Sequence, residues 1–270
     1  MGSVQKLLHI MSRLRDPESG CPWDLRQTYA SIVPYTLEEA YEVADAIQRG
    51  DMRELRDELG DLLFQVVFYS QIASEEGHFD FNQVVEGICD KMLRRHPHVF
   101  ADAEYESDEA LRQAWESTKA RERAQRRDAG VHSELDGVAR ALPALIRAEK
   151  LQKRAARVGF DWPDAAGALD KLAEELAEVR TALAGGDDDG VQDELGDLLF
   201  SVVNVVRLLG RDAEQTLSQA NEKFERRFRA MEQAIRQRGG NDLHALSAEA
   251  WDSAWEAVKH QQAETGGGGD

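Results

Sequence analysis

The chain has 270 residues, of which 42% are hydrophobic and 31% are charged, a composition typical of a folded protein with more than one domain. Its 51 acidic and 33 basic residues give a formal net charge of −18, which argues against nucleic acids and anionic membranes as partners. Cys21 and Cys89 are too few for a disulfide framework, and no run of about 18 apolar residues could span a membrane, so the sequence predicts a cytoplasmic location.

The first strong pattern along the chain is helical. Apolar residues recur every three or four positions on both sides of Gly50-Asp51, which predicts two long helices separated by a turn. The motif GCPWD, from Gly20 to Asp24, precedes them. Nothing alternates with a period of two for long enough to indicate a sheet, so the predicted fold class is all-α.

Residues 119–133 read KARERAQRRDAGVHS, a strongly charged segment that predicts an exposed helix end and a linker. Apolar periodicity resumes after it, and the chain ends in GGGGD. We therefore expect an N-terminal module over residues 1–118, a linker over 119–133, a C-terminal module over 134–263 and a disordered tail over 264–270.

The two modules are copies of one unit. Residues 38–67 and 174–203 align without a gap at a constant offset of 136, and 17 of the 30 positions are identical. A helical hairpin of this size exposes a wide apolar stripe. We therefore expect each module to complete a four-helix-bundle core by dimerisation.

Both copies carry the same acids, EExxE followed by ExxD. In the first copy these are Glu38, Glu39, Glu42, Glu58 and Asp61, and in the second they are Glu174, Glu175, Glu178, Glu194 and Asp197. Residues three apart share one face of a helix, so each copy has carboxylate pairs on two consecutive helices. Such groups resist ionisation unless a cation neutralises them, and oxygen ligands suit Mg²⁺, with Mn²⁺ as a substitute. A lone EExxE is usually a solvated surface, but the joined and repeated pattern predicts a metal site, with ligands Glu39, Glu42, Glu58 and Asp61 in the first copy.

This arrangement resembles the MazG family, whose hallmark is EExxE…ExxD in a helical bundle, and the two-module layout is similar to that of full-length bacterial members. The motifs GCPWD and VGFDW, the latter from Val158 to Trp162, also match. The resemblance implies Mg²⁺-dependent hydrolysis of nucleoside triphosphates to the monophosphate and pyrophosphate by a homodimer. It further implies a broad or house-cleaning specificity and a link to alarmone turnover.

The resemblance also assigns residues in the second module. It implies that the metal ligands are Glu175, Glu178, Glu194 and Asp197, that Lys223 and Arg227 bind phosphate and act in catalysis, and that Trp255 closes the nucleotide site. An exposed charged helix face is the alternative for the two cations. Their echo in the first module, at Lys91, Arg95 and Trp115, favours substrate binding.

Glu174, or Glu38 in the first module, is the acid that we expect to orient or deprotonate the attacking water. Both modules keep all five acids, and we expect the C-terminal module to be the active one. Trp23 and Trp162 either stack on the base or pack in the core.

Two other functions compete with this interpretation. A di-iron carboxylate bundle would need Glu-x-x-His pairs, and none of the seven histidines lies three residues after a motif acid. A non-catalytic helical scaffold or regulatory dimer that retains a metal site is the main alternative. Within the enzyme class, a narrower specificity, for example for a deoxyuridine nucleotide, stays open.

Overall fold

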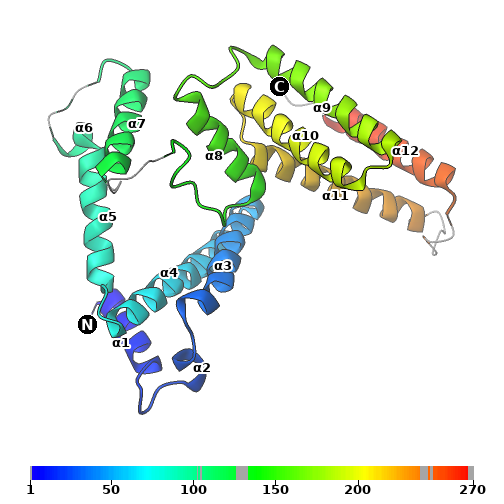
Figure 1. Ribbon diagram of the computed structural model, residues 1–270. Coiled ribbons are helices and arrows are strands. Elements are labelled where there is room, and N and C mark those ends of the chain that lie inside the picture. The colour runs from blue at the N-terminus through cyan, green and yellow to red at the C-terminus, as the bar shows by residue number, and fades with distance from the viewer. Residues whose placement is uncertain are drawn as a thin grey trace. The chain divides into compact units, whose positions relative to one another are not determined.

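The computed structural model describes residues 2–101, 103, 105–125, 133–237, 243 and 246–266. Within these ranges the regular elements are all helices, which confirms the all-α prediction. The chain divides into two compact units, Met1–Asp128 and Ala129–Asp270 (Figure 1). No helix in the described part of the chain is long and apolar enough to cross a membrane.

The first unit is built around the hairpin of α3 and α4. Its helices are α1 (Ser3–Leu14), α2 (Pro22–Leu25), α3 (Tyr29–Arg49), α4 (Met52–Glu75), α5 (Phe81–Arg95), α6 (Pro97–Phe100) and α7 (Asp108–Gln125). The turn lies where the sequence placed it. Gly50 ends α3 in the left-handed conformation with φ 70°, and Asp51 caps α4 by accepting from the backbone N–H of Arg53 and Glu54.

Helix α1 packs on α4 and closes a small core. The buried side chains of this core are Met11, Ile32, Val67, Phe68 and Ile72. Arg15, just after α1, is almost fully buried and binds Glu75 through two nitrogens, at 2.6 and 2.9 Å. It also donates to the backbone oxygen of Asp24 at 2.6 Å, so one guanidinium ties α1, α2 and α4 together.

The second unit repeats the hairpin. Its helices are α8 (Ala144–Ala156), α9 (Ala165–Gly185), α10 (Asp188–Leu208), α11 (Ala213–Gln237) and α12 (Ala248–Gly266). Gly186, with φ 68°, ends α9, and Asp187 caps α10 by accepting from the backbone N–H of Gly190. Helix α10 packs on α9 and α8, and α11 pairs with α12.

The segment boundaries differ in detail from those expected. The units divide between residues 128 and 129, within the segment 119–133, whose first residues continue α7 to Gln125. Helix α12 continues to Gly266, into the segment 264–270 that the sequence predicts as a tail, and the disorder of that tail stays a prediction. Residues 126–132 and 267–270 lie outside the described residues.

Both hairpins leave large apolar side chains in solvent. On α3 and α4 these include Tyr41, Ile47, Leu59 and Leu63, and on α9 and α10 they include Leu169, Leu183 and Leu199. Large apolar patches on a protein surface are typical of interaction sites. Dimerisation of the hairpins stays a prediction that these side chains support.

Candidate functional site

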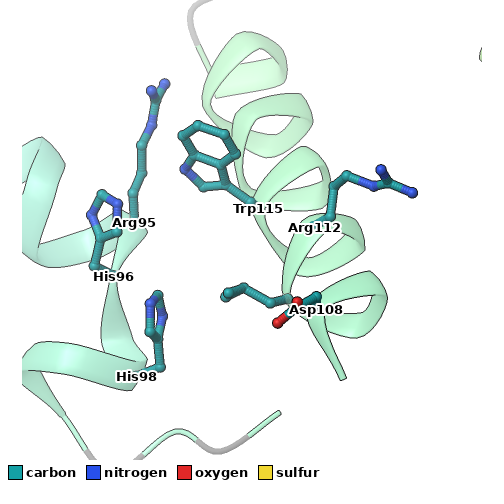
Figure 2. Close-up of a pocket in the computed structure, with 7 residues that line it drawn as sticks. Arg95, His96, His98, Asp108, Arg112 and Trp115 are labelled. Atoms are coloured by element: carbon teal, nitrogen blue, oxygen red, sulfur yellow. The ribbon is translucent and has the colours of Figure 1, made fainter. Parts of the chain in front are cut away.

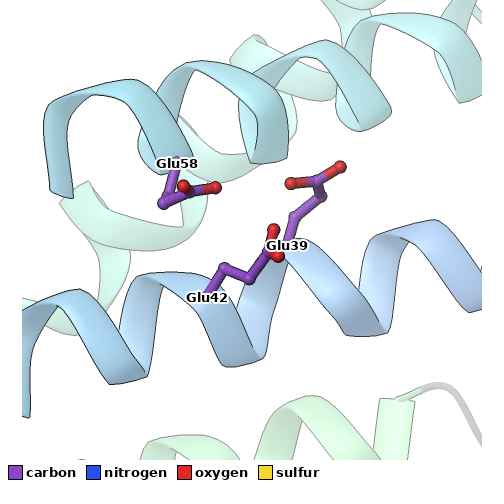
Figure 3. Close-up of side chains that lie close together, drawn as sticks. All are labelled: Glu39, Glu42 and Glu58. Carbon is purple, nitrogen blue, oxygen red and sulfur yellow. The ribbon is translucent and has the colours of Figure 1, made fainter. Parts of the chain in front are cut away.

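The first carboxylate cluster lies between α3 and α4. Glu39 and Glu42 project from α3 toward Glu58 of α4 (Figure 3). One oxygen from each lies within 4.8 Å of the others. The amide nitrogen of the buried Gln65 donates to Glu39 Oε1 at 3.4 Å. The hairpin thus brings together three of the four ligands predicted for this module.

The fourth predicted ligand, Asp61, acts on this cluster through its charge. Burial raises the pKa of Glu39, and the nearby Asp61 and Glu42 raise it further. Burial, Glu42 and Asp61 likewise raise the pKa of Glu58. The folded chain therefore holds these groups at an electrostatic cost that a bound cation would relieve.

The second cluster lies between α9 and α10. One oxygen each from Glu175, Glu194 and Asp197 lies within 4.8 Å of the others. Glu175 is only 4% exposed, which makes it the most buried acid of the two clusters. Glu178 is not one of the acids that contribute these three oxygens. Burial raises the pKa of Glu178, Lys171 lowers it, and Glu194 and Glu175 raise it further.

Sequence reasoning missed Lys171. Its Nζ lies 2.8 Å from Glu174 Oε1 and 2.9 Å from Glu175 Oε1, and these hydrogen bonds raise the pKa of the ammonium. Its counterpart at the offset of 136 is Tyr35, so the first cluster has no lysine at this position. Lys171 precedes Glu174 by three residues and Glu175 by four on one helix, and this spacing was the signal in the sequence that could have predicted the contact.

Glu174 is exposed and is held by Lys171. Glu174 could therefore orient or deprotonate the attacking water only after releasing Lys171, and this role stays a prediction.

Two of the three residues predicted to bind substrate in the first module, Arg95 and Trp115, line one cavity. Arg95, His96 and Trp115 line it, with His98 opposite Asp108 (Figure 2). Its volume is about 330 Å³. Lys91 is not among its lining residues.

Arg95 is already engaged there. It donates to Glu122 at 2.5 and 3.1 Å, and Arg94 binds the same carboxylate at 2.9 Å. These bonds lower the pKa of Glu122 to about 2. Lys119 lies 3.6 Å above the ring of Trp115. Arg95 and Trp115 are thus neighbours, but a phosphate would have to compete with Glu122 for the arginine.

In the second module the corresponding residues lie on α11 and α12. Lys223 is exposed and Arg227 is half-buried. The ring of Trp255 lies 5.5 Å from that of Phe224. No ion pair among the described residues joins Lys223 to Glu175, Glu194 or Asp197, so within one chain the structure does not bring this lysine onto the acids.

Comparison with known proteins places both clusters within matched segments. The sequence matches the MazG nucleotide pyrophosphohydrolase domain twice, over residues 27–100 and 166–231. A nucleoside triphosphate pyrophosphohydrolase from Escherichia coli (strain K12) is 52% identical over 264 residues, which are 97% of this chain and 99% of that protein. The Thermotoga maritima protein named nucleoside triphosphate pyrophosphohydrolase/pyrophosphatase MazG is 41% identical and covers 94% of this chain and 95% of its own length.

Among solved structures, a mazG-related protein from Thermotoga maritima matches with a TM-score of 0.37 and 26% identity. The match covers 43% of this chain and 98% of that one. The domain matches and the nearly full-length relatives confirm the resemblance inferred from the motifs. The chain therefore belongs to the MazG family of enzymes, the nucleotide pyrophosphohydrolases, with one family domain in each module.

Proposed function

We propose that this chain hydrolyses nucleoside triphosphates to the monophosphate and pyrophosphate, with Mg²⁺ and in its C-terminal module. The observation that carries the proposal is the oxygen cluster of Glu175, Glu194 and Asp197 on two adjacent helices of a MazG domain. The relatives named above carry the same activity in their names.

The donor set fits a hard divalent cation. It contains carboxylate oxygens alone, with neither histidine nor cysteine in either cluster. Mg²⁺ prefers a few carboxylates together with waters and substrate phosphates, and Mn²⁺ accepts the same ligands. The raised pKa values of Glu39, Glu58 and Glu178 point the same way, because repulsion among the acids is greatest without a cation.

In the reaction, Glu175, Glu178, Glu194 and Asp197 would hold the metal. Bound Mg²⁺ would supply charge neutralisation at the triphosphate and acidify a coordinated water. Lys223 and Arg227, one helical turn apart on α11, would hold the phosphates and stabilise the leaving pyrophosphate, with Trp255 closing the site. Glu174 would orient the water or take its proton.

No ion pair among the described residues joins Lys223 to the clustered acids of its own chain. The exposed apolar faces of the hairpins support a homodimer in which a second copy covers them. The proposal includes a broad, house-cleaning specificity, a role in alarmone turnover and a cytoplasmic location with no nucleic acid or membrane partner. The alarmone role rests on the family resemblance alone.

The test is pyrophosphate release from a panel of ribo- and deoxynucleoside triphosphates, with Mg²⁺ and with EDTA. Glu175→Gln and the matched Glu39→Gln separate the two modules. We expect release that needs metal, yields monophosphate and is lost in Glu175→Gln but kept in Glu39→Gln. Loss in both variants would mean that the modules share the work. A folded dimer that releases nothing from any nucleotide would refute the proposal and favour the scaffold.

A further inference from the structure

The cavity of the first unit has no part in the function proposed above. It is lined by Arg95 and Trp115, which the repeated motif predicts to bind substrate. It is also lined by His98 of α6, whose ring nitrogen Nδ1 is buried and has no hydrogen-bond partner among the described residues (Figure 2). A cavity of about 330 Å³ with an aromatic wall and a few polar groups has the size and chemistry of a small-molecule site.

A carboxylate of the same unit holds the arginine of this cavity. Glu122 follows Trp115 by seven residues on α7, which is two helical turns along the same face, or about 10 Å. Its Oε2 accepts from Arg95 Nη2 at 2.5 Å and from Arg95 Nε at 3.1 Å. Its Oε1 accepts from Arg94 Nε at 3.0 Å and lies 2.9 Å from Arg94 Nη2. The Glu122 side chain is only 11% exposed, so two guanidinium groups enclose one carboxylate.

This contact has the form that a phosphate would take. Arginine binds carboxylates and phosphates through the same two-nitrogen geometry. The hydrogen bond from Arg95 is the main reason that the pKa of Glu122 is lowered to about 2, against the opposing effect of burial. The arginines therefore hold the ionised acid firmly, and a phosphate can reach Arg95 only by displacing Glu122.

The second module carries no acid at the matched position of the motif. The residue seven positions after Trp115 is Glu122, whereas the residue seven positions after Trp255 is Gln262. The Gln262 side chain lies outside the described residues, but an amide is neutral and has no charge to offer an arginine in place of a phosphate. The two modules thus share the arginines and the tryptophan and differ by one negative charge.

We infer that Glu122 closes the phosphate position of the first module, so that this module rejects triphosphates and the second accepts them. Glu122 is an internal competitor, because it is tethered beside Arg94 and Arg95 at an effective concentration that a free phosphate must overcome. The inference rests on the proposed function, in which the matched Arg227 holds a phosphate. It deepens that function by naming the residue that decides which module takes the substrate.

The experiment measures the binding of inorganic tripolyphosphate, the part of the substrate without base and sugar, by calorimetry in EDTA. A background with Lys223→Met and Arg227→Met removes the phosphate-binding residues proposed for the second module, so that the first module reports. We expect the dissociation constant to fall at least about tenfold in Glu122→Gln, because a neutral amide competes weakly for the two arginines. Adding Arg95→Met should remove this gain.

Glu86→Gln, on α5 about 13 Å along the helix from Arg95, removes one negative charge away from the contact and should keep the affinity of the background protein. Circular dichroism reports folding for every variant, and Glu122→Ala tests the inference even where Glu122→Gln fails to fold.

Equal affinity with and without Glu122 would overturn the inference. So would a gain that Glu86→Gln matches, which would reflect net charge alone, or a gain that survives Arg95→Met, which would place the anion elsewhere. Tripolyphosphate binding needs no hydrolysis, whereas the proposed function is tested by pyrophosphate release from the wild-type protein, so the two failures are distinguishable.

Discussion

Replacing Lys171 with methionine is expected to strengthen metal binding by the C-terminal cluster. The ammonium lies 2.8 Å from Glu174, 2.9 Å from Glu175 and 3.9 Å from Glu178. It therefore already neutralises part of the negative charge that a divalent cation would meet. Methionine has a similar apolar stem and removes only the charge, so the comparison isolates the competition between the ammonium and the metal.

The size of the effect follows from the charges involved. Two unit charges about 4 Å apart in water-like surroundings change an equilibrium constant by roughly fivefold, and a divalent ion squares that factor to roughly thirtyfold. The Lys171 side chain is 36% exposed, so solvent and salt reduce the effect. We expect the dissociation constant for Mn²⁺ without nucleotide to fall about tenfold in Lys171→Met.

The assay is a Mn²⁺ titration followed by the electron paramagnetic resonance signal of the free ion. A background with Glu39→Gln and Glu58→Gln silences the first cluster, so that only the second one reports. Tyr35→Met, at the matched position of the first module, is the control and should leave the affinity unchanged. Equal affinity with and without Lys171 would refute the competition. Weaker affinity in Lys171→Met would show instead that the ammonium positions Glu175.

Three further predictions concern stability. Arg15→Lys loses the two-nitrogen contact with Glu75 and should lower the free energy of unfolding of the first unit by about 2 kcal/mol. Urea titrations measure this value, and an unchanged free energy would contradict the role given to the guanidinium. Burial and the nearby Glu42 and Asp61 raise the pKa of Glu58, so without metal its ionisation destabilises the fold as pH rises through the window above 4.5. Glu58→Gln should therefore be more stable than wild type at neutral pH and equal to it below that window, as thermal melts in EDTA would show. The pKa of Glu122 is lowered to about 2, so the ionised carboxylate stabilises the fold above pH 4.5 and this stabilisation is lost as pH falls toward 2. The stabilisation is about 1 kcal/mol after allowance for solvent screening. Glu122→Gln should remove this pH dependence from acid-unfolding curves.

The secondary structure could be predicted from the sequence because the signals that determine it are local. Helical periodicity and the Gly50-Asp51 boundary act over a few residues, and the structure places the first hairpin turn there. The repeat at a constant offset also identified both acid sets and, through them, the family. The structure continues α12 to Gly266, beyond the module end predicted at residue 263, and helix ends are assigned only to within one or two residues.

The sequence by itself thus determined the helical class, the duplication and the acids, since these follow from residue type and spacing along one chain segment. Only the tertiary structure decided which acids meet, because that depends on how two helices face each other. The three close oxygens of the first cluster include Glu42 and not Asp61, whereas those of the second include Asp197 and not Glu178. Only the structure showed that Lys171 occupies the second cluster and that Glu122 already holds Arg95. The buried Oε1 of Gln152, which has no hydrogen-bond partner among the described residues, also reflects packing between helices and cannot be predicted from residue spacing.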